Sequence, residues 1–187
     1  MRILACADLH GAPERIARVR ELAAEHAPAV VVLAGDLTDG EAGGRWLDLP
    51  RTLPMPVLAV PGNMDGPNAA LEIAENGRLT GEQPVTIDGV TFGGPNVGQT
   101  CDLVVVHIPP WGTLDAVGAG EHIGSRRIRD LIARTRPRAL VCGHVHDRPG
   151  IVQAGPTLVV NCSMGAGKAS GALLEIGPGG PTAKLLP

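Results

Sequence analysis

Short apolar runs of strand length recur along this chain, and five of them lead directly into polar residues. The five runs are residues 2–7, 29–34, 56–62, 102–107 and 138–143. Runs of this length rich in Val, Leu and Ala are typical of strands that are buried on both faces. Open α/β sheets hold their ligands at the carboxyl ends of such strands. The pattern therefore predicts a layered α/β protein with a polar site along one edge.

Helical patterns lie between these runs. Three segments carry apolar residues at helical spacing, namely 12–27, 67–77 and 124–137. Ser125 is the expected N-cap of the last of them, and Pro137 its stop. A looser helix is expected over residues 41–53, broken at Pro50.

The second half of the chain is rich in β patterns. Residues 84–94 alternate around Asp88 and Gly89, which is a strong signal for a two-residue hairpin turn. Further strands are expected at residues 150–155, 157–163, 171–177 and 182–187. Parallel strands with crossover helices first and hairpins later predict two packed sheets flanked by helices. Residues 1–187 are expected to form one domain, without a linker or a repeat.

Composition narrows the function classes. Hydrophobic residues make up 44% of the 187 residues but aromatic residues only 2%, so the core is expected to be aliphatic. A net charge of −3 gives no electrostatic footprint for duplex nucleic acid. The basic stretch 125–138 is interrupted by apolar residues at helical spacing and is interpreted as a solvated helix face.

The cellular compartment is predicted from cysteine usage and from the absence of targeting patterns. The four cysteines lie in or beside apolar runs and form no CxxC pair, which favours buried, reduced thiols. The first apolar run is short and is followed early by Asp8, so no signal peptide is expected. No stretch has the length of a membrane span. We therefore expect a soluble, cytoplasmic protein that does not act at a membrane.

The polar residues after the five strands are of metal-binding types. They are Asp8, His10, Asp36, Asp39, Asn63, Asp65, His107, His144 and His146. Asp8 and His10 are two residues apart, which would point both to one side of an extended strand end, and the same spacing separates His144 from His146. Carboxylate, imidazole and amide oxygen together suit Mn, Fe, Zn, Ni or Co better than calcium.

Taken singly, each of these motifs has an ordinary structural explanation. A lone histidine is more often a surface or core residue than a ligand, and Asp36 or Asp39 could simply cap a helix. The ordered set of five, each after a strand, is much more specific than any member.

This set resembles the five motifs of the calcineurin-like metallophosphoesterases. The matching elements are DLH, GDLTD, GNMD, the isolated His107 and GHVH, which run from residue 8 to residue 146. Residues 104–115 and 120–132 also resemble a small prokaryotic subgroup related to the Icc phosphodiesterases. The resemblance implies a four-layer α/β/β/α sandwich, with two mixed β-sheets flanked by helices and a dinuclear metal centre in loops at one edge.

The resemblance also implies a ligand set. A first metal would be held by Asp8, His10, Asp36 and His146, and a second by Asp36 as a bridge with Asn63, His107 and His144. Manganese is the expected metal, with Fe, Ni, Zn and Co left open. A hydroxide between two such ions would attack phosphorus in line with the leaving group.

Catalysis is accordingly assigned to three of these ligands, Asp36, Asn63 and His107. Asn63 could also orient a phosphoryl oxygen through its NH2 group. The C-terminal strands are not expected to contribute to the site. Asp65 and Asp39 are expected to orient neighbouring ligands or turns, with a helix cap as the equal alternative for Asp39.

Met64 stands where members of this family often carry histidine, which is generally assigned to protonating the leaving oxygen. A thioether has no proton to give. The predicted substrates are therefore small phosphodiesters with good leaving groups, or strained 2′,3′-cyclic nucleotides, whereas unactivated monoesters should react poorly. His122 in a glycine-rich loop is a candidate replacement acid, with an exposed loop histidine as the ordinary reading.

Substrate binding is assigned to Asn63, Trp111 and His122. Trp111 lies four residues after His107 and would stack on a nucleobase or pack its loop against the scaffold. Two other functions stay open: a non-catalytic interaction scaffold on the same fold, and a nuclease, which would need a basic, aromatic channel. The short C-terminal strands could also form a homodimer surface.

Overall fold

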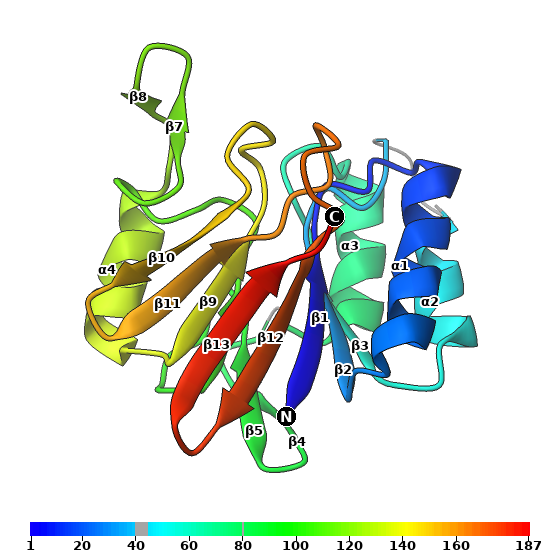
Figure 1. Ribbon diagram of the computed structural model, residues 1–187, viewed down its shortest axis with the longest axis horizontal. Coiled ribbons are helices and arrows are strands. Elements are labelled where there is room, and N and C mark those ends of the chain that lie inside the picture. Colours follow the sequence, from blue (N-terminus) through cyan, green and yellow to red (C-terminus); the bar gives the residue numbers. More distant parts are fainter. Residues whose placement is uncertain (40–44, 80) are drawn as a thin grey trace.

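The computed structural model describes residues 1–39, 45–79 and 81–187 (Figure 1). One sheet has the strand order β13-β12-β1-β2-β3, and the other has the order β10-β11-β9-β6-β5-β4. The strands of the first sheet are β1 (Arg2–Cys6), β2 (Val30–Ala34), β3 (Val57–Val60), β12 (Ala172–Gly177) and β13 (Gly180–Leu185). β1, β2 and β3 run parallel, whereas β12 and β13 are antiparallel additions.

The second sheet is mixed in the same way. Its strands are β4 (Val85–Ile87), β5 (Val90–Gly93), β6 (Leu103–Val105), β9 (Ala139–Cys142), β10 (Gly150–Ala154) and β11 (Thr157–Asn161). β5, β6, β9 and β11 are parallel, and the two edge strands pair antiparallel. A separate two-stranded hairpin, β7 (Ala116–Val117) and β8 (Glu121–His122), projects from the body of the molecule (Figure 1).

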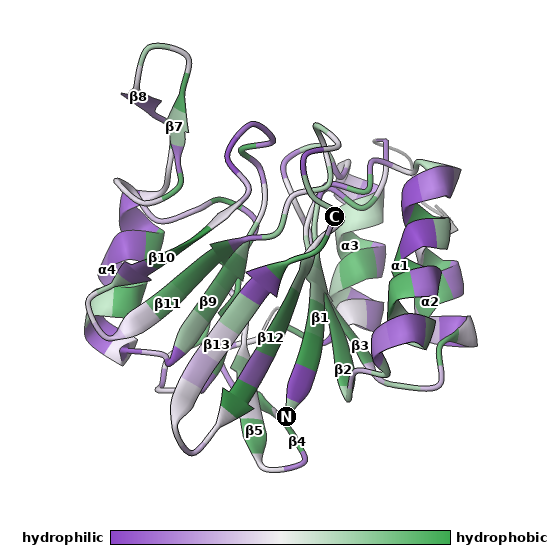
Figure 2. Cartoon of the chain, viewed as in Figure 1, coloured by the Kyte–Doolittle hydropathy of each residue, from purple (hydrophilic) through white to green (hydrophobic). Residues whose placement is uncertain are grey.

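Helices cover the outer face of each sheet. The first sheet is flanked by α1 (Pro13–His26), η1 (Arg45–Leu47), α2 (Asp48–Thr52) and α3 (Pro67–Gly77), and the second by α4 (Arg126–Thr135) (Figure 1). The result is a four-layer α/β/β/α arrangement, as predicted. Figure 2 shows hydrophobic residues concentrated on the strands and hydrophilic residues on the outer sides of the helices.

The apolar strands bury both of their faces, which explains why they are apolar throughout. In β2, Val32 and Ala34 face the core between the sheets, whereas Val31 and Leu33 face the helices. β9 divides in the same way, with Val141 toward the other sheet and its neighbours toward α4. The carboxyl ends of both sets of parallel strands are thereby held at one edge of the sandwich.

Several local expectations are confirmed. Asp88 and Gly89 have φ of 46° and 78°, the left-handed values that a tight hairpin turn requires. Ser125 caps α4 by accepting a hydrogen bond from the Ile128 amide at 3.3 Å. All four cysteines are free and buried, and burial raises the pKa of Cys6 to about 12.

The expected break at Pro50 is wrong. Pro50 lies inside α2, in the first turn, where a missing N–H costs no intrahelical hydrogen bond. The earlier part of that expected helix, residues 40–44, lies outside the described residues. Among the described residues, no helix combines the length and hydrophobicity needed to cross a membrane.

The C-terminal β segments do not form one ribbon. β10 and β11 extend the second sheet, whereas β12 and β13 cross to the first sheet and pair with β1. Hydrophobic patterning alone does not say which sheet a hairpin joins, because either sheet buries the same side chains. The hairpin β7–β8 was also not expected from the sequence, since its strands are only two residues long.

Candidate metal centre

Backbone hydrogen bonds tie the strand-end loops together at one edge. The amide of Asp8 donates to Gly35 at 3.0 Å, and the amide of His10 donates to Asp36 at 2.9 Å. In the second sheet, the amide of Gly143 donates to His107 at 3.0 Å. These bonds set the spacing between the loops before any side chain is considered.

Four of the predicted ligands adopt left-handed backbone conformations. The φ angles are 61° for Asp8, 49° for His10, 52° for Asp36 and 69° for His144. The prediction that paired ligands would lie on an extended strand end is therefore wrong, because β1 ends at Cys6 and the chain then turns sharply. Such conformations are costly for residues other than glycine, and they gather where function demands a fixed geometry.

The first ligand group joins both sheets. His10 Nε2 lies 3.3 Å from His146 Nε2, which in turn lies 3.4 Å from Asp8 Oδ1. Asp36 Oδ2 lies 4.0 Å from His10 Nε2. The ligand atoms of Asp8, His10 and His146 all lie within 4.8 Å of one another, which is close enough to share one ion.

The second group is centred on His107. Its Nε2 lies 2.9 Å from Asn63 Oδ1 and 3.3 Å from Asp36 Oδ2, and its ring contacts that of His144 with centroids 5.1 Å apart. Asp36 Oδ2 thus faces both groups. The structure brings together all seven predicted ligands, and both Asp36 and Asp8 lie within 4.0 Å of histidines in the two groups.

The donor atoms around His107 fit a cation. His107 Nδ1 lies 2.9 Å from the carbonyl oxygen of Ala34, which only accepts, so Nδ1 carries the proton. In the neutral ring, Nε2 then holds a lone pair that faces two further acceptors, Asn63 Oδ1 and Asp36 Oδ2. Three lone pairs directed at one another repel unless a proton or a metal ion lies among them. A backbone carbonyl that fixes the histidine tautomer is also characteristic of metal sites.

Burial and charge shift the pKa values of the site in opposite directions. Burial alone would lower the pKa of His107, but the hydrogen bond and charge of Asp36 raise it overall. Burial alone would raise the pKa of Asp36, but His107 and the Met64 amide lower it overall. Burial lowers the pKa of His10 and His144, which favours the neutral, metal-binding imidazole.

Four glycines make room for the ligands. A β-carbon at Gly35 would lie 2.6 Å from His107 Nδ1, and one at Gly143 would lie 2.6 Å from Asp8 Oδ2. A β-carbon at Gly62 would overlap the Asp36 carboxylate, and one at Gly165 would overlap the His146 ring. Any side chain at these positions would displace a ligand, so backbone and donor set are fitted to each other.

The calcineurin-like phosphoesterase family model matches residues 1–148, which contain every predicted ligand. The chain belongs to this family. The prediction made from the motifs is thus confirmed, and the two ligand groups are the candidate sites for the divalent metals that the family uses.

Curated relatives resemble the chain to different extents. The uncharacterised protein MJ1162 of Methanocaldococcus jannaschii is 28% identical over 197 residues, which cover 87% of this chain and 88% of that protein. The UPF0046 protein K07C11.7 of Caenorhabditis elegans is 29% identical over 125 residues, covering 54% of this chain and 41% of that protein. The chain therefore spans less than half the length of the nematode relative.

Solved structures share the fold. TT1561 of Thermus thermophilus superimposes with a TM-score of 0.71 at 17% identity, with 98% of each chain covered. An archaeal phosphodiesterase gives a TM-score of 0.63 at 17% identity over all of both chains. Vps29 of Entamoeba histolytica, solved with zinc, gives 0.52 at 15% identity over 100% of this chain and 98% of that one. The metallophosphoesterase fold predicted from the sequence is thus confirmed.

Asp65 links the two turns that carry Asp36 and Asn63. Its Oδ1 accepts the amides of Leu37 at 3.0 Å and Thr38 at 2.9 Å, and its Oδ2 accepts the amide of Gly62 at 2.8 Å. The contacts match the orienting role expected for this residue. Asp39, by contrast, is exposed and lies beside Gly11, and the helix-cap alternative for it falls on residues 40–44, outside the described part.

Met64 contributes its backbone rather than its side chain. Its amide donates to Asp36 Oδ1 at 2.8 Å, while the side chain is 52% exposed. The Met64 backbone therefore holds the Asp36 carboxylate in place whatever its side chain is. This explains how a thioether is accommodated among ligands without disturbing them.

The loop after β11 supports the site, which corrects the expectation that the C-terminal strands do not contribute. The amide of Met164 donates to Ala7, and Gly165 packs directly beneath the His146 ring. Arg15 Nη1 and Nη2 donate to the carbonyls of Asp8 and Gly165, both at 2.9 Å. Sequence reasoning missed Arg15 and Gly165, because no pattern in the chain links residues 150 positions apart.

The two remaining predicted residues, Trp111 and His122, lie next to each other. Their ring centroids are 5.4 Å apart, and the Arg126 guanidinium lies 4.3 Å from the Trp111 ring. His122 Nδ1 lies 2.7 Å from Oδ1 of buried Asp115, whose Oδ2 accepts the amides of Gly112 and Gly124. Trp111 thus packs within its loop, and Asp115 holds His122 against it.

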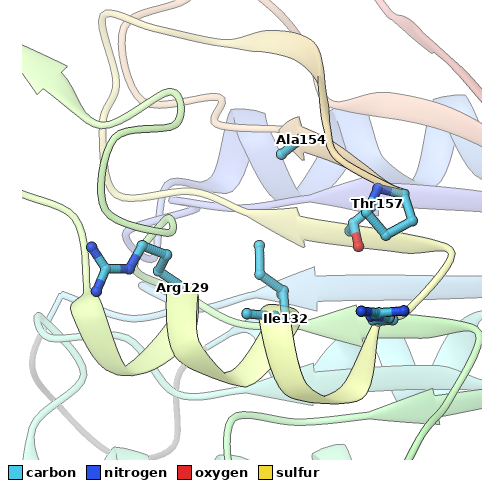
Figure 3. A pocket seen from close by; sticks show the side chains of 7 residues that line it. Arg129, Ile132, Ala154 and Thr157 are labelled. Atoms are coloured by element: carbon cyan, nitrogen blue, oxygen red, sulfur yellow. The ribbon is translucent and has the colours of Figure 1, made fainter.

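A cavity of about 330 Å³ lies away from this centre, between α4 and the strands β10 and β11 (Figure 3). Arg129 and Ile132 line it from the helix, and Ala154 and Thr157 from the strands. No residue of the predicted metal centre lines it, so this cavity takes no part in the site.

Proposed function

We propose that this protein is a dimetal-dependent phosphoesterase that hydrolyses small phosphodiesters. The observation that supports it most directly is that Asp36 Oδ2 and Asn63 Oδ1 both lie within 3.3 Å of His107 Nε2, beside a second group of ligands that Asp36 also approaches. A site that directs lone pairs at common points is built for cations.

The metals would be held by the seven strand-end residues. The first group is Asp8, His10, Asp36 and His146, and the second is Asp36, Asn63, His107 and His144. When bound, two divalent ions supply an acidified water and charge stabilisation for the phosphoryl oxygens. Manganese is the proposed metal, because the mixed oxygen and nitrogen donors suit it, with Fe, Ni, Zn and Co as alternatives.

The chain's own residues position these groups and the substrate. The Ala34 carbonyl fixes the His107 ring, and the Met64 amide fixes Asp36. Asn63 directs Oδ1 at His107, so its NH2 group is left to donate to a phosphoryl oxygen. Asp36, Asn63 and His107 are therefore the residues proposed for catalysis.

The preference for diesters with good leaving groups rests on Met64. A mostly exposed thioether offers no proton to a departing alkoxide. Activated diesters and strained 2′,3′-cyclic nucleotides can release their leaving group without a proton donor, so they are the proposed substrates. Alkyl monoesters need such a donor and are not proposed. The fold shared with an archaeal phosphodiesterase agrees with this class. Trp111 and His122 are the proposed contacts for the remainder of the substrate. The cytoplasmic location and the homodimer remain predictions from the sequence.

The second candidate is a non-catalytic interaction scaffold, since Vps29, a vacuolar protein sorting protein by name, has the same fold. Hydrolysis of bis-p-nitrophenyl phosphate separates the two, because nitrophenolate needs no acid to leave. Metal-stripped protein should be inactive, Mn²⁺ should restore turnover, and Asp36→Asn should abolish it. Folded protein without turnover in Mn²⁺, Ni²⁺, Co²⁺ or Zn²⁺ would instead favour the scaffold.

A further inference from the structure

A second cavity shares a wall with the metal centre. It has a volume of about 190 Å³ and is lined by His107 itself, by Pro61, two residues before Asn63, and by the first turn of α4. Because His107 and Asn63 are in contact at 2.9 Å, a group in this cavity lies next to whatever the two residues bind. The cavity is therefore placed to receive part of the substrate.

The walls of this cavity are mainly apolar. Ile108, Ile128, Pro61 and Pro95 line it, and Ile128 is only 5% exposed. Ser125, the lining hydroxyl, already accepts the Ile128 amide as the helix cap. An apolar hollow beside a polar, charged centre is the usual arrangement of a site that orients one end of a ligand and buries the other.

Arg127, which also lines the cavity, already makes hydrogen bonds to neighbouring residues. Arg127 Nη2 lies 2.7 Å from Asn96 Oδ1 and 3.4 Å from the carbonyl of Pro95. These bonds occupy Nη2 and join α4 to the loop after β5, so the guanidinium adds positive charge to the lining of the cavity. Because the phosphoryl group is proposed to bind at the metal centre, the mainly apolar cavity is left for an uncharged group.

The volume of the cavity limits how large that uncharged group can be. Pockets that bury a whole drug-sized ligand have volumes of roughly 300–1,000 Å³. A cavity of about 190 Å³ holds one substituent rather than a complete substrate. Two of its walls are prolines, whose fixed φ limits how far the cavity can widen.

We propose that the cavity beside His107 receives one ester substituent of the phosphodiester, a compact apolar group such as a single aromatic ring. This inference rests on the proposed function and names the substrate class more closely. Ile108 is the specificity-determining residue, because it lines the cavity directly after His107 in sequence and is only half-buried. A larger side chain at Ile108 has room to occupy the cavity without entering the core.

Phosphonates test this without turnover, because each carries a single substituent beside its phosphoryl group. We would titrate Mn²⁺-loaded protein calorimetrically with methylphosphonate and with phenylphosphonate. Wild type should bind phenylphosphonate about tenfold more tightly, since burying a ring removes apolar surface from water. Ile108→Phe should bring the two affinities to within about twofold while leaving that for methylphosphonate unchanged.

Two further variants guard against misfolding and nonspecific effects. Ile108→Ala removes wall contacts without adding bulk and should also reduce the preference for phenylphosphonate. Ile123→Phe makes the same substitution on the hairpin, at a side chain that is 37% exposed, and should keep the wild-type ratio. Thermal melts of all variants establish that the fold is retained.

The outcomes separate this inference from the proposed function. Three results would overturn the cavity assignment, whatever the turnover of bis-p-nitrophenyl phosphate. They are equal affinity of wild type for the two phosphonates, no binding of either, and an unchanged ratio of the two affinities in Ile108→Phe. The expected ratios without any turnover would leave the cavity assignment standing and remove the proposed catalysis.

Discussion

Asp36 connects several parts of the site through its side chain and its backbone. Its side chain faces His107 and His10, and it accepts the Met64 amide. Its carbonyl accepts the His10 amide. All of this requires a left-handed backbone with φ of 52°, which the preceding Gly35 and the following turn must stabilise. At the scale of the residue, the site therefore depends on neighbours that bind no metal.

Asp65 provides a direct test of that dependence. Asp65→Asn replaces one acceptor oxygen by an NH2 group, so either the Gly62 amide or the amides of both Leu37 and Thr38 lose their acceptor. Because such supporting contacts orient ligands, we expect Mn²⁺ affinity to fall about 10–100-fold, measured by calorimetry. Asp130→Asn, on an exposed helix face, is the control and should leave the affinity unchanged. Equal Mn²⁺ affinities of Asp65→Asn and wild type would show that the turns carrying Asp36 and Asn63 keep their conformation without this carboxylate.

Met64→His tests the account of the leaving group. The backbone amide that holds Asp36 is retained, and the side chain is exposed, so the fold should tolerate the change. We expect diesters with poor leaving groups to react up to about 10²-fold faster, the lower end of what general acids provide. Turnover of bis-p-nitrophenyl phosphate serves as the control and should change little. A uniform gain across leaving groups would contradict a role in proton donation.

At the scale of the element, the hairpin β7–β8 is anchored at its base rather than along its length. Asp115 is buried and accepts the amides of Gly112 and Gly124 at 3.0 Å each, in addition to His122. The amide of Ile123 donates to the Asp115 carbonyl. One carboxylate thus closes the loop between β6 and α4, and the two-residue strands contribute little themselves.

Removal of that carboxylate should loosen the hairpin without unfolding the protein. In Asp115→Ala we expect amide hydrogen exchange at Gly112 and Gly124 to accelerate at least about tenfold, since each loses a charge-assisted bond. The amides of α4 should keep their protection, because Ser125 still caps that helix. Unchanged exchange at both glycines would mean that the backbone alone holds the loop.

At the scale of the whole molecule, charged side chains outside the site join the sheets. Arg138 at the start of β9 donates to Asp102 beside β6 and to the Gly177 carbonyl at the end of β12. Asp102 also accepts the amide and hydroxyl of Thr91 at 2.9 and 2.7 Å. The network lies at the opposite ends of the strands from the metal centre, so each edge of the sandwich has its own polar connection.

Asp102 gives the fold a predictable sensitivity to acid. Burial alone would raise the pKa of this carboxyl, but Thr91 and Arg138 lower it overall. The folded protein then binds this proton less readily than the unfolded chain, so the stabilisation is complete above a pH of about 5 and is lost progressively as the pH falls further. In urea unfolding, Asp102→Asn should cost about 1–2 kcal/mol at pH 7 and progressively less below a pH of about 5. A constant difference at all pH values would refute the assignment.

Metal binding should stabilise the whole sandwich, because the ligand groups draw residues from both sheets. At a free Mn²⁺ concentration of 100 times the Kd, one site adds about 2.7 kcal/mol to the free energy of unfolding. Thermal melts with and without Mn²⁺ would measure this, with Asp36→Asn as the control that should not respond. An equal response of that variant would place the stabilising ion elsewhere.

Local patterns were enough to predict the main strands, the longer helices and the family. Runs such as residues 29–34 are apolar throughout because both faces of a central parallel strand are covered, and local patterns of this kind survive without tertiary information. Asp88-Gly89 and Ser125 were predictable for the same reason, since turn and cap preferences act over a few residues. The polar residues at the strand ends were recognisable because each follows its strand directly, and the family resemblance then implied which seven would be ligands.

The surroundings of these candidate ligands depend on the three-dimensional fold. The left-handed backbone at Asp8 and the contact of Gly165 with His146 depend on loops that are distant in sequence. So does the choice of sheet for β12, which pairs with β1 at the other end of the chain. Hydrophobic periodicity predicts that a strand is buried, but it does not predict which strand it pairs with. Burial of the same side chains is about equally favourable in either sheet. The residues that surround the candidate ligands are therefore set by contacts between segments distant in sequence, not by local sequence patterns.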